Sequence, residues 1–228
     1  FMVAATDGSL RSPFQPPGVT SLEGMLFPDT YQVSNAESEG QVIERMIALM
    51  ERVVDQEDIV NRSRALGVTP YEALIVASMI EREAKVPEDR AKIARVIYNR
   101  LGLSQLDPDN PTLLQIDATV LYGADLAGLD PNSSFAELRV VDGPYNTYTR
   151  PGLPPTPIAN PGRASIAAAL NPAPNPSDGD PICAELAEPT NCAYIYYVIA
   201  DEDGRHVFAS EQWQHARNVE LARQAGIQ

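Results

Sequence analysis

One apolar stretch constrains the fold more than any other part of the sequence. LIVASMI, residues 74–80, contains no charged residue, and EREAK follows it directly. Thr69 suits an N-cap and Pro70 suits a first helical turn, which predicts a helix from Pro70 to about Lys85. A helix that is apolar on nearly every side is buried in a core. We therefore expect a central helix that carries two glutamates at its end.

The two glutamates fall on different sides of this helix. At about 100° per residue, Glu83 lies in the apolar arc with Met79 and Ile80, whereas Glu81 lies on the polar side with Lys85. Lys85 follows Glu81 by four residues, the favourable order for an exposed ion pair. Apolar surroundings raise the pKa of a carboxyl group, so that it stays protonated near neutral pH as a general acid requires. The pattern favours Glu83 as an acid and Glu81 as a solvated surface residue.

Two more amphipathic helices are predicted beside the central one. Residues 36–66 contain VIERMIALMERVV, with apolar positions at spacings of three and four. Residues 88–101 begin with two acidic residues, which suit a first turn, and continue with one apolar face. This second helix leaves a structural alternative for Glu83, an ion pair with Arg95 or Arg100.

The region from residue 102 to residue 162 has a different composition. Pro, Gly, Asn and Asp interleave with LLQIDATVLYG and GPYNTYTRPGLPPTPIANPG. A structureless loop of that length is uncommon in a compact domain unless it has a function. We expect short helices near residues 112–122 and 134–138, and then an ordered wall of a groove.

The C-terminal part predicts a hairpin. AYIYYVIA and HVFAS flank a DEDG turn, after a short helix at 163–170 and before a helix that starts near residue 211. The expected fold class is α+β, with a helical core that carries the acid on its central helix, a C-terminal β-hairpin and irregular segments that form a groove. Residues 1–35, rich in Pro, Gly and Ser, form an irregular or short-strand N-terminal segment of the same domain as residues 36–228.

The charge balance argues against some partners. The 31 acidic and 17 basic residues give a net charge of -14, which disfavours nucleic acid and anionic lipid, because phosphate binding depends on clustered Lys and Arg. No run approaches the roughly 20 apolar residues that cross a bilayer, and the first residues, FMVAATDG, do not read as a signal peptide. A neutral or zwitterionic polymer fits better.

The two cysteines suit a disulfide. Cys183 and Cys192 bracket the loop CAELAEPTNC, and closing it stabilises a protein by roughly 2.5 to 3 kcal/mol on the loop-entropy model, in an oxidising compartment. Two buried thiols are the alternative. A zinc site is not favoured, because only His206 and His215 remain as further ligands and no paired CxxC is present. We expect no metal and no cofactor, and assign the histidines to structural hydrogen bonds.

The most specific evidence is a series of short motifs. They are LEGMLFPDTY (22–31), ASMIEREA (77–84), IYNRL (97–101), LQIDATVLYG (114–123), PYNTY (144–148), GLPPTPIANPG (152–162), and YIYYVIADEDGRHVF with QWQH (194–208 and 212–215). In this order, from Leu22 to Val219, they make the chain resemble the YceG-like, or MltG-type, endolytic murein transglycosylases of bacteria. In that family the second Glu of an E-x-E pair is the catalytic acid, which corresponds to Glu83. The helical wheel and the resemblance indicate the same residue.

The resemblance implies a reaction and a location. The family cleaves the β-1,4 bond between N-acetylmuramic acid and N-acetylglucosamine of peptidoglycan without water, and leaves 1,6-anhydromuramoyl ends that terminate nascent strands. The implied partners are peptidoglycan strands, peptidoglycan synthases and the elongation machinery. The implied location is the extracytoplasmic face of the bacterial cell membrane, with a single-pass N-terminal anchor. That anchor and a LysM-like module would both precede Phe1.

The matching motifs also supply candidates for substrate binding. These candidates are Gln115, Asp117, Asn146, Tyr148, Tyr98, Asn99 and Tyr145. Structural alternatives stay open, because Asn146 also suits a turn and Asp117 also suits a helix cap. Tyr122, Tyr145 and Tyr148 form either a sugar-stacking platform or parts of the core.

Some residues depart from the family pattern, and others have two possible roles. Ala84 stands where some members have a hydroxyl residue, and the insertion at 172–192 has no assigned function. Glu23 and Asp29 either line the groove or brace the N-terminal segment, and we favour bracing. Two rival functions remain, a hydrolytic muramidase with Asp117 as its second carboxylate and a non-catalytic glycan-binding scaffold module.

Overall fold

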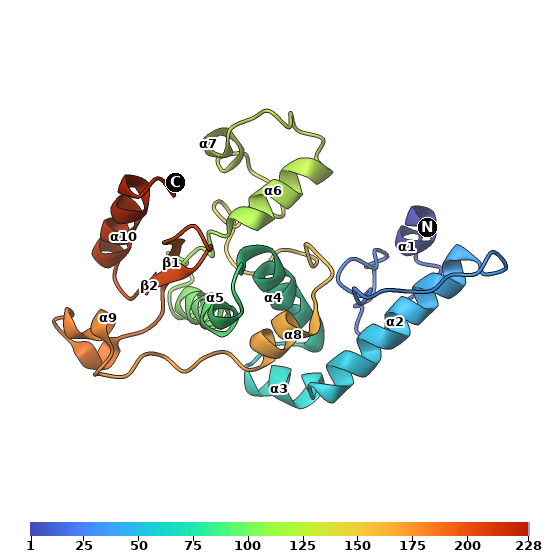
Figure 1. The fold of residues 1–228 in the computed structure, drawn as a ribbon, viewed down its shortest axis with the longest axis horizontal. Helices are drawn as coiled ribbons and strands as arrows, with labels where there is room; N and C mark the ends of the chain where they lie inside the picture. The colour runs from blue at the N-terminus through green and yellow to red at the C-terminus, as the bar shows by residue number, and fades with distance from the viewer. Residues whose placement is uncertain (228) are drawn as a thin grey trace.

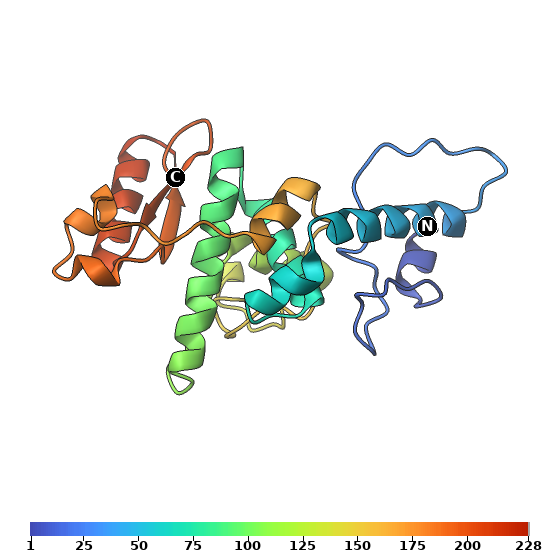
Figure 2. The same cartoon turned by 90° about the horizontal axis from the view of Figure 1, so that it is seen from below.

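The structure, a computed structural model, describes residues 1–227 and is elongated, with the N-terminus in one half of its long axis and the C-terminus in the other (Figures 1 and 2). The order of elements is α1 (Met2–Thr6), α2 (Glu39–Gln56), α3 (Ile59–Ala65), α4 (Pro70–Glu83), η1 (Pro87–Asp89), α5 (Arg90–Leu106), α6 (Asp117–Leu126), α7 (Phe135–Leu138), α8 (Arg163–Leu170), α9 (Pro181–Ala184), η2 (Pro189–Asn191), β1 (Tyr196–Ile199), β2 (His206–Ala209) and α10 (Gln212–Gln224). A helical body around α4 thus separates an N-terminal arm from a C-terminal part.

Helix α4 forms the centre of the core. Its first turn is fixed by a capping box, in which the Glu72 backbone N–H donates to Thr69 Oγ1 and the Thr69 backbone N–H donates to the Glu72 carboxylate. Every residue from Ala73 to Ile80 is buried. The expectation of a buried central helix is confirmed, and the helix ends at Glu83.

Helices α5 and α8 pack on α4 (Figure 1). Figure 2 shows α5 running between the helical body and the C-terminal hairpin. The Tyr98 hydroxyl on α5 donates to the Ala169 carbonyl of α8 at 3.0 Å. Ser78, in the buried part of α4, accepts a hydrogen bond from the Ile158 backbone N–H at 3.0 Å and thereby fixes the loop 152–162 against the core.

The prediction of one helix over residues 36–66 was wrong, because the chain forms two helices there, α2 and α3. The break is at Asp58, whose φ is 53°. Asp tolerates this left-handed conformation better than most residues, because its short polar side chain bonds locally. Here the Asp58 carboxylate accepts from the Asn61 amide at 2.7 Å, and the chain turns toward α4.

The N-terminal segment packs into the same core. Its only helix among the described residues is α1 and no strand forms there, so of the two predicted alternatives the segment takes the irregular one. Leu22 and Met25 are fully buried. Asn160 joins this segment to the loop 152–162, because its side-chain oxygen accepts from the Leu26 backbone N–H at 3.0 Å and its amide donates to Glu23 at 3.4 Å. Glu23 therefore has the bracing contact that we favoured.

The C-terminal part contains the hairpin. Strands β1 and β2 pair antiparallel, with Tyr196 opposite Ala209 and Ile199 opposite His206. Helix α10 packs on both strands. Cys183 and Cys192 form a disulfide within the insertion. The hairpin and the helical core together give the α+β class that the sequence predicts.

A lobe made of α6 and α7 projects from the body (Figure 1). Helix α6 begins at residue 117 rather than near residue 112, because Gln115 has a φ of 54° that no helical residue adopts. Helix α7 begins after the Ser134 cap, close to the predicted start. The α6–α7 lobe contacts α4 through α6.

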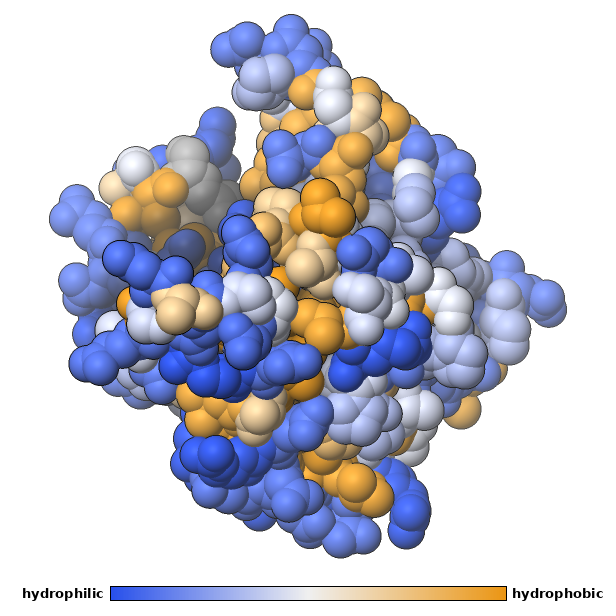
Figure 3. Space-filling view, turned by 90° about the vertical axis from the view of Figure 1, so that its right-hand side faces the viewer, coloured by the Kyte–Doolittle hydropathy of each residue, from blue (hydrophilic) through white to orange (hydrophobic). Residues whose placement is uncertain are grey.

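The surface is mainly polar. Figure 3 shows the N-terminal face, on which apolar residues gather toward the upper part. Exposed apolar side chains on or next to the α6–α7 lobe include Leu126, Val140 and Val141. Within residues 1–227, no helix combines the length and the apolar character that crossing a bilayer requires.

Gly24 and Gly18 offer a matched test of the contact that holds the N-terminal segment. Both residues have a left-handed φ, 80° and 85°. A Cβ at Gly24 would overlap the Pro157 ring, whereas a Cβ at Gly18 would meet nothing within 4 Å. Both Ala variants carry a backbone penalty of about 1 kcal/mol, and overpacking adds about 1 to 3 kcal/mol at Gly24 alone. Chemical denaturation should therefore show Gly24→Ala less stable than Gly18→Ala, and equal stabilities would contradict this packing.

Candidate active site

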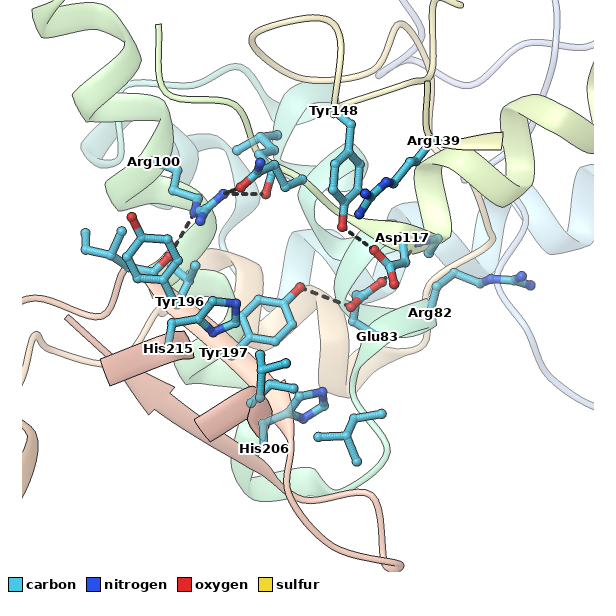
Figure 4. A pocket seen from close by; sticks show the side chains of 18 of the residues that line it. Arg82, Glu83, Arg100, Asp117, Arg139, Tyr148, Tyr196, Tyr197, His206 and His215 are labelled. Carbon is cyan, nitrogen blue, oxygen red and sulfur yellow. Dashed lines mark hydrogen bonds between the residues drawn. The ribbon is translucent and has the colours of Figure 1, made fainter. Parts of the chain in front are cut away.

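A large cavity lies where α4 ends. Its volume is about 1010 Å³. The end of α4 and the first turn of α6 form its floor, the α6–α7 lobe forms one wall, and the hairpin with α10 forms the opposite wall (Figure 4). Segments far apart in the sequence therefore meet at one site.

Glu83 lies on the floor of this cavity. Its Oε1 accepts a hydrogen bond from the Ala118 backbone N–H at 3.2 Å, and its Oε2 accepts one from the Tyr197 hydroxyl at 3.1 Å (Figure 4). Ala118 is in the first turn of α6, so a free helix N–H points at the carboxyl group. Both alternatives that would pair Glu83 with Arg95 or Arg100 are contradicted, because both arginines donate to backbone carbonyls instead.

Opposing influences act on Glu83. Burial raises its pKa most strongly, because it disfavours the charged form. The hydrogen bonds from Ala118 and Tyr197 lower the pKa, nearby Asp117 raises it, and Lys85 lowers it. The net direction is upward. Glu83 thus keeps its proton at higher pH than an exposed glutamate does.

Asp117 and Tyr148 form a second polar pair beside Glu83. The Tyr148 hydroxyl donates to Asp117 Oδ1 at 2.5 Å, and both side chains line the cavity (Figure 4). Asp117 is the first residue of α6 but its side chain does not act as the cap. Burial and the bond to Asp117 raise the pKa of Tyr148, which therefore stays a neutral donor at neutral pH.

Glu81 is exposed, as predicted, but the ion pair with Lys85 that its spacing suggests does not form between the described side chains. Its Oε2 accepts from the Gly162 backbone N–H at 3.1 Å and from the Ser165 hydroxyl at 2.6 Å. Gly162 is the N-cap of α8. Glu81 therefore caps the N-terminus of α8, where a negative charge is favourable.

A buried histidine packs against the ring of Tyr197. His206 Nδ1 lies 2.9 Å from Asp89 Oδ2, and its backbone N–H donates to the same oxygen at 2.7 Å. The His206 side chain is 2% exposed and meets the Tyr197 ring edge to face, with centroids 5.2 Å apart. Asp89 thus fixes His206, and His206 packs on the ring whose hydroxyl contacts Glu83. The structural role assigned to His206 agrees with these contacts.

Three of the substrate-binding candidates share the cavity with Glu83: Gln115, Asp117 and Tyr148. The Gln115 side-chain oxygen accepts from Arg100 Nη1 at 2.9 Å. Its φ of 54° places a non-glycine residue in the left-handed region, which costs of order 1 to 3 kcal/mol and is common at functional sites.

Tyr98 and Asn99, two further substrate-binding candidates, do not line this cavity. Tyr98 contacts α8, as described above. The Asn99 amide donates to the Tyr194 carbonyl at 2.9 Å and to the Asn175 side chain at 2.7 Å. Both α5 side chains hold neighbouring segments in place.

Tyr145 and Asn146 also have structural partners. The Asn146 amide donates to the carbonyls of Arg139 and Val141, and its oxygen accepts from the Tyr148 backbone N–H. Asn146 therefore shapes the turn that presents Tyr148, which is the structural alternative left open for it.

The three tyrosines do not form one sugar-stacking platform. Tyr145 bonds to Thr156 at 2.7 Å and packs edge to face on Tyr122, with ring centroids 5.0 Å apart. Tyr148 instead pairs with Phe135 at 5.8 Å. Of the three, only Tyr148 lines the cavity.

Sequence reasoning missed several cavity residues: Arg82, Arg100, Arg139, Tyr196, Tyr197 and His215. Arg100, Tyr197 and His215 all lie within quoted motifs, IYNRL, YIYYVIADEDGRHVF and QWQH, so the motifs marked the right segments. The alternation of a strand does not show which tyrosine faces a distant glutamate. Among the described residues, no group of three or more metal-ligating side chains converges.

Comparison with known proteins identifies the family. The sequence model of the YceG-like family matches residues 4–221. The chain belongs to the YceG-like family. The match includes the N-terminal segment, the cavity floor and the hairpin, so the elements that build the cavity all lie within the family's shared region.

Three named proteins and one solved structure illustrate this similarity. An endolytic murein transglycosylase of Bacillus subtilis is 39% identical over 200 residues, which are 87% of this chain and 47% of that protein. Endolytic murein transglycosylases of two Streptococcus pneumoniae strains are 32% identical over 202 residues, 87% of this chain and 32% of theirs. A crystal structure of a yceG-like protein from Listeria monocytogenes has a TM-score of 0.69 at 29% identity, covering 95% of this chain and 62% of that one. The chain thus spans between about a third and a half of the curated relatives.

Removing the Tyr197 hydroxyl should raise the pKa of Glu83 further. The hydroxyl stabilises the carboxylate by donating to it, so Tyr197→Phe disfavours ionisation. A carbon-13 NMR titration of the Glu83 side chain measures this shift. Tyr98→Phe is the control, because it also deletes one hydroxyl but lies outside the cavity. A Glu83 pKa that stays the same or falls in Tyr197→Phe would contradict the geometry.

Glu83→Gln should stabilise the fold at neutral and alkaline pH. Because the folded-state pKa is raised, the folded protein holds more protons than the unfolded chain, and stability falls as pH rises between the unfolded value of about 4.3 and the folded value. Gln removes this loss and still accepts the Ala118 N–H. Denaturation at a series of pH values should show the variant more stable above the folded pKa and equal to the parent below about pH 4. A gain that grows toward acid would refute a raised pKa.

Proposed function

We propose that this chain is the catalytic domain of an endolytic murein transglycosylase. The observation that carries the proposal is Glu83, a carboxyl group of raised pKa that faces a large cavity at the end of a buried helix. The relatives named endolytic murein transglycosylases support the substrate, peptidoglycan. The bond that we assign is the β-1,4 bond between N-acetylmuramic acid and N-acetylglucosamine.

Glu83 acts first as an acid and then as a base. Its proton goes to the glycosidic oxygen as the bond from that oxygen to C1 of the muramic sugar breaks, which leaves an oxocarbenium-like centre at C1. The Glu83 carboxylate then takes the proton of the C6 hydroxyl on the same sugar while O6 bonds to C1. The product is a 1,6-anhydro end, no water is consumed, and Glu83 regains its proton.

The neighbours of Glu83 suit both steps. Before cleavage, burial keeps the acid protonated. After cleavage, the Ala118 N–H and the Tyr197 hydroxyl stabilise the carboxylate. Because O6 belongs to the sugar itself, the enzyme needs one acid and an orienting pocket rather than the two carboxylates of ordinary glycosidases.

Asp117 has a supporting electrostatic role in this proposal. Its charge lies close enough to raise the pKa of Glu83, and Tyr148 holds it in place. A carboxylate at this position favours positive charge on the sugar in the transition state. A hydrolytic muramidase would instead use Asp117 to position a water, and the mass of the product separates the two reactions.

We also propose the setting in which the domain works. Residues 1–35 and 36–228 form one catalytic domain, held at the extracytoplasmic face of the membrane by a single-pass anchor outside this chain, next to a LysM-like module. The enzyme then terminates nascent strands beside the peptidoglycan synthases and the elongation machinery. The match covers 32% to 47% of the relatives' own lengths, which supports the proposal that the whole protein has additional segments.

Digestion of uncross-linked glycan strands, followed by mass spectrometry, tests the reaction and its acid. The parent chain should give 1,6-anhydro ends, and Glu83→Gln should lower their rate of formation by a factor of roughly 10² or more, because general acid catalysis contributes that much. Glu81→Gln is the matched control, two residues away on α4, and should retain most of the activity because Gln still accepts from Gly162.

Each other result changes the proposal in a defined way. Ends that are heavier by one water would establish the muramidase reaction. Equal activity of the parent chain and Glu83→Gln would remove Glu83 as the acid. Equal glycan binding by both proteins, with no cleavage by either, would support the rival function, a non-catalytic glycan-binding scaffold module.

A further inference from the structure

The end of the cavity away from Glu83 contains a buried positive charge. Arg100 is 6% exposed, and its guanidinium donates only to neutral oxygens, the carbonyls of Leu113, Leu114 and Ile195 and the side chain of Gln115. No carboxylate of the described residues pairs with it. A buried cation without a counter-ion is costly, and this one lines an open cavity.

His215 adds an unused polar atom at the same end. Its ring stacks on Tyr196 with centroids 5.2 Å apart, and the Arg100 guanidinium lies 4.8 Å from the centroid of that tyrosine ring. His215 Nδ1 is buried and has no hydrogen-bond partner within the described chain. Burial and the charge of Arg100 lower the pKa of His215, so the ring is neutral at neutral pH. Nδ1 of His215 therefore lacks the expected structural hydrogen bond within residues 1–227.

Gln115 completes this group. Its oxygen already accepts from Arg100, so its amide nitrogen is left without a partner among the described residues. The left-handed φ of Gln115 directs the chain so that the side chain lines the cavity. Arg100, Gln115 and His215 thus line one end of the cavity, where the guanidinium and the amide are donors and the neutral imidazole ring supplies one further N–H.

The donor set lies at a fixed position relative to the acid. Figure 4 shows Arg100, Tyr196 and His215 at one end, Glu83 and Asp117 at the other, and Tyr197 between them. Both ends of the cavity act on Tyr197, because Glu83 raises the pKa of the Tyr197 hydroxyl and Arg100 lowers it. A group bound at Arg100 and a bond cleaved at Glu83 therefore belong to different parts of one extended ligand.

We propose that Arg100, Gln115 and His215 form a carboxylate-binding subsite for the glycan strand. The inference rests on the proposed function, because it takes peptidoglycan as the polymer. Every second sugar of that polymer carries a lactyl ether, whose carboxyl group is free in peptide-free strands and joined to a peptide in others, and the peptides carry carboxylates of their own. The shared chemistry is a carboxylate on or near the muramic sugar, and Arg is the side chain best suited to bind it.

Binding to the inactive Glu83→Gln chain tests the subsite separately from cleavage. The probes are a peptide-free glycan oligosaccharide with free lactyl carboxylates, its methyl ester, and the same oligosaccharide with peptides attached. Calorimetry should show that esterification weakens binding roughly tenfold or more, because hydrogen bonds to a charged group are stronger than those to a neutral one. Whichever of the free-acid and peptide-bearing strands binds more tightly identifies the source of the carboxylate.

His215→Phe, added to Glu83→Gln, is the main variant. Phe keeps a ring that stacks on Tyr196 and deletes the nitrogen, so it should weaken binding of the carboxylate strand severalfold and leave the ester unchanged. Arg100→Gln should do the same more strongly, and His215→Phe keeps the test valid if Arg100→Gln does not fold. Arg150→Gln removes a positive charge outside this cavity, at the exposed Asp142 pair, and should change neither affinity.

The outcomes separate the two proposals. Equal binding of the acid and the ester, or an equal loss of both in His215→Phe, would overturn the carboxylate subsite while cleavage by the parent chain upheld the proposed function. Absence of glycan binding and of cleavage would overturn both. A loss confined to the carboxylate strand establishes the subsite.

Discussion

The site depends on the burial of one carboxyl group, that of Glu83. Because α4 is buried from Ala73 to Ile80, its last turn, although partly exposed, holds the Glu83 carboxyl group at the inner side of the cavity. Burial disfavours the carboxylate, while the first turn of α6 and the Tyr197 hydroxyl favour it. The net direction of the Glu83 pKa is upward, which favours the protonated acid, and the two donors stabilise the carboxylate after the proton has left. Three other hydrogen bonds hold the elements around Glu83 in place. Glu81 fixes α8 against α4, Ser78 fixes the loop 152–162, and Asp89 fixes the hairpin.

The net charge of the whole chain does not indicate which charged residues line its cavity. The protein is strongly acidic overall, yet Arg82, Lys85, Arg100 and Arg139 all line the cavity around three acidic groups. A net charge describes the average field outside a protein, and screening limits it to about 8 to 10 Å at physiological salt. An acidic exterior is therefore compatible with local recognition of an anionic group on a polymer.

The sequence predicts the elements better than it predicts their contacts. The capping residues and the unbroken apolar run were sufficient to predict α4 and the side of it on which Glu83 lies, because a helical wheel describes local geometry. The break at Asp58 was missed, since it depends on a single left-handed residue within an otherwise continuous amphipathic pattern. The same limit applies to the site: Asn99 and Tyr145 lie in matching motifs but face structural partners, whereas Tyr197 reaches Glu83 from a strand 114 residues later. Motifs locate segments, and only packing determines which side chain of a segment faces the cavity.

The pH dependence of cleavage tests the central claim most directly. The measurement is kcat/KM for uncross-linked glycan strands across the acidic to alkaline range, which reports the ionisation of the free enzyme. If protonated Glu83 is the acid, kcat/KM should fall on the alkaline side with an apparent pKa above the ordinary value of a glutamic acid. Activity that instead rises as pH passes through the ordinary carboxyl range, with no alkaline fall, would show that the ionised group is the active form and would contradict the account.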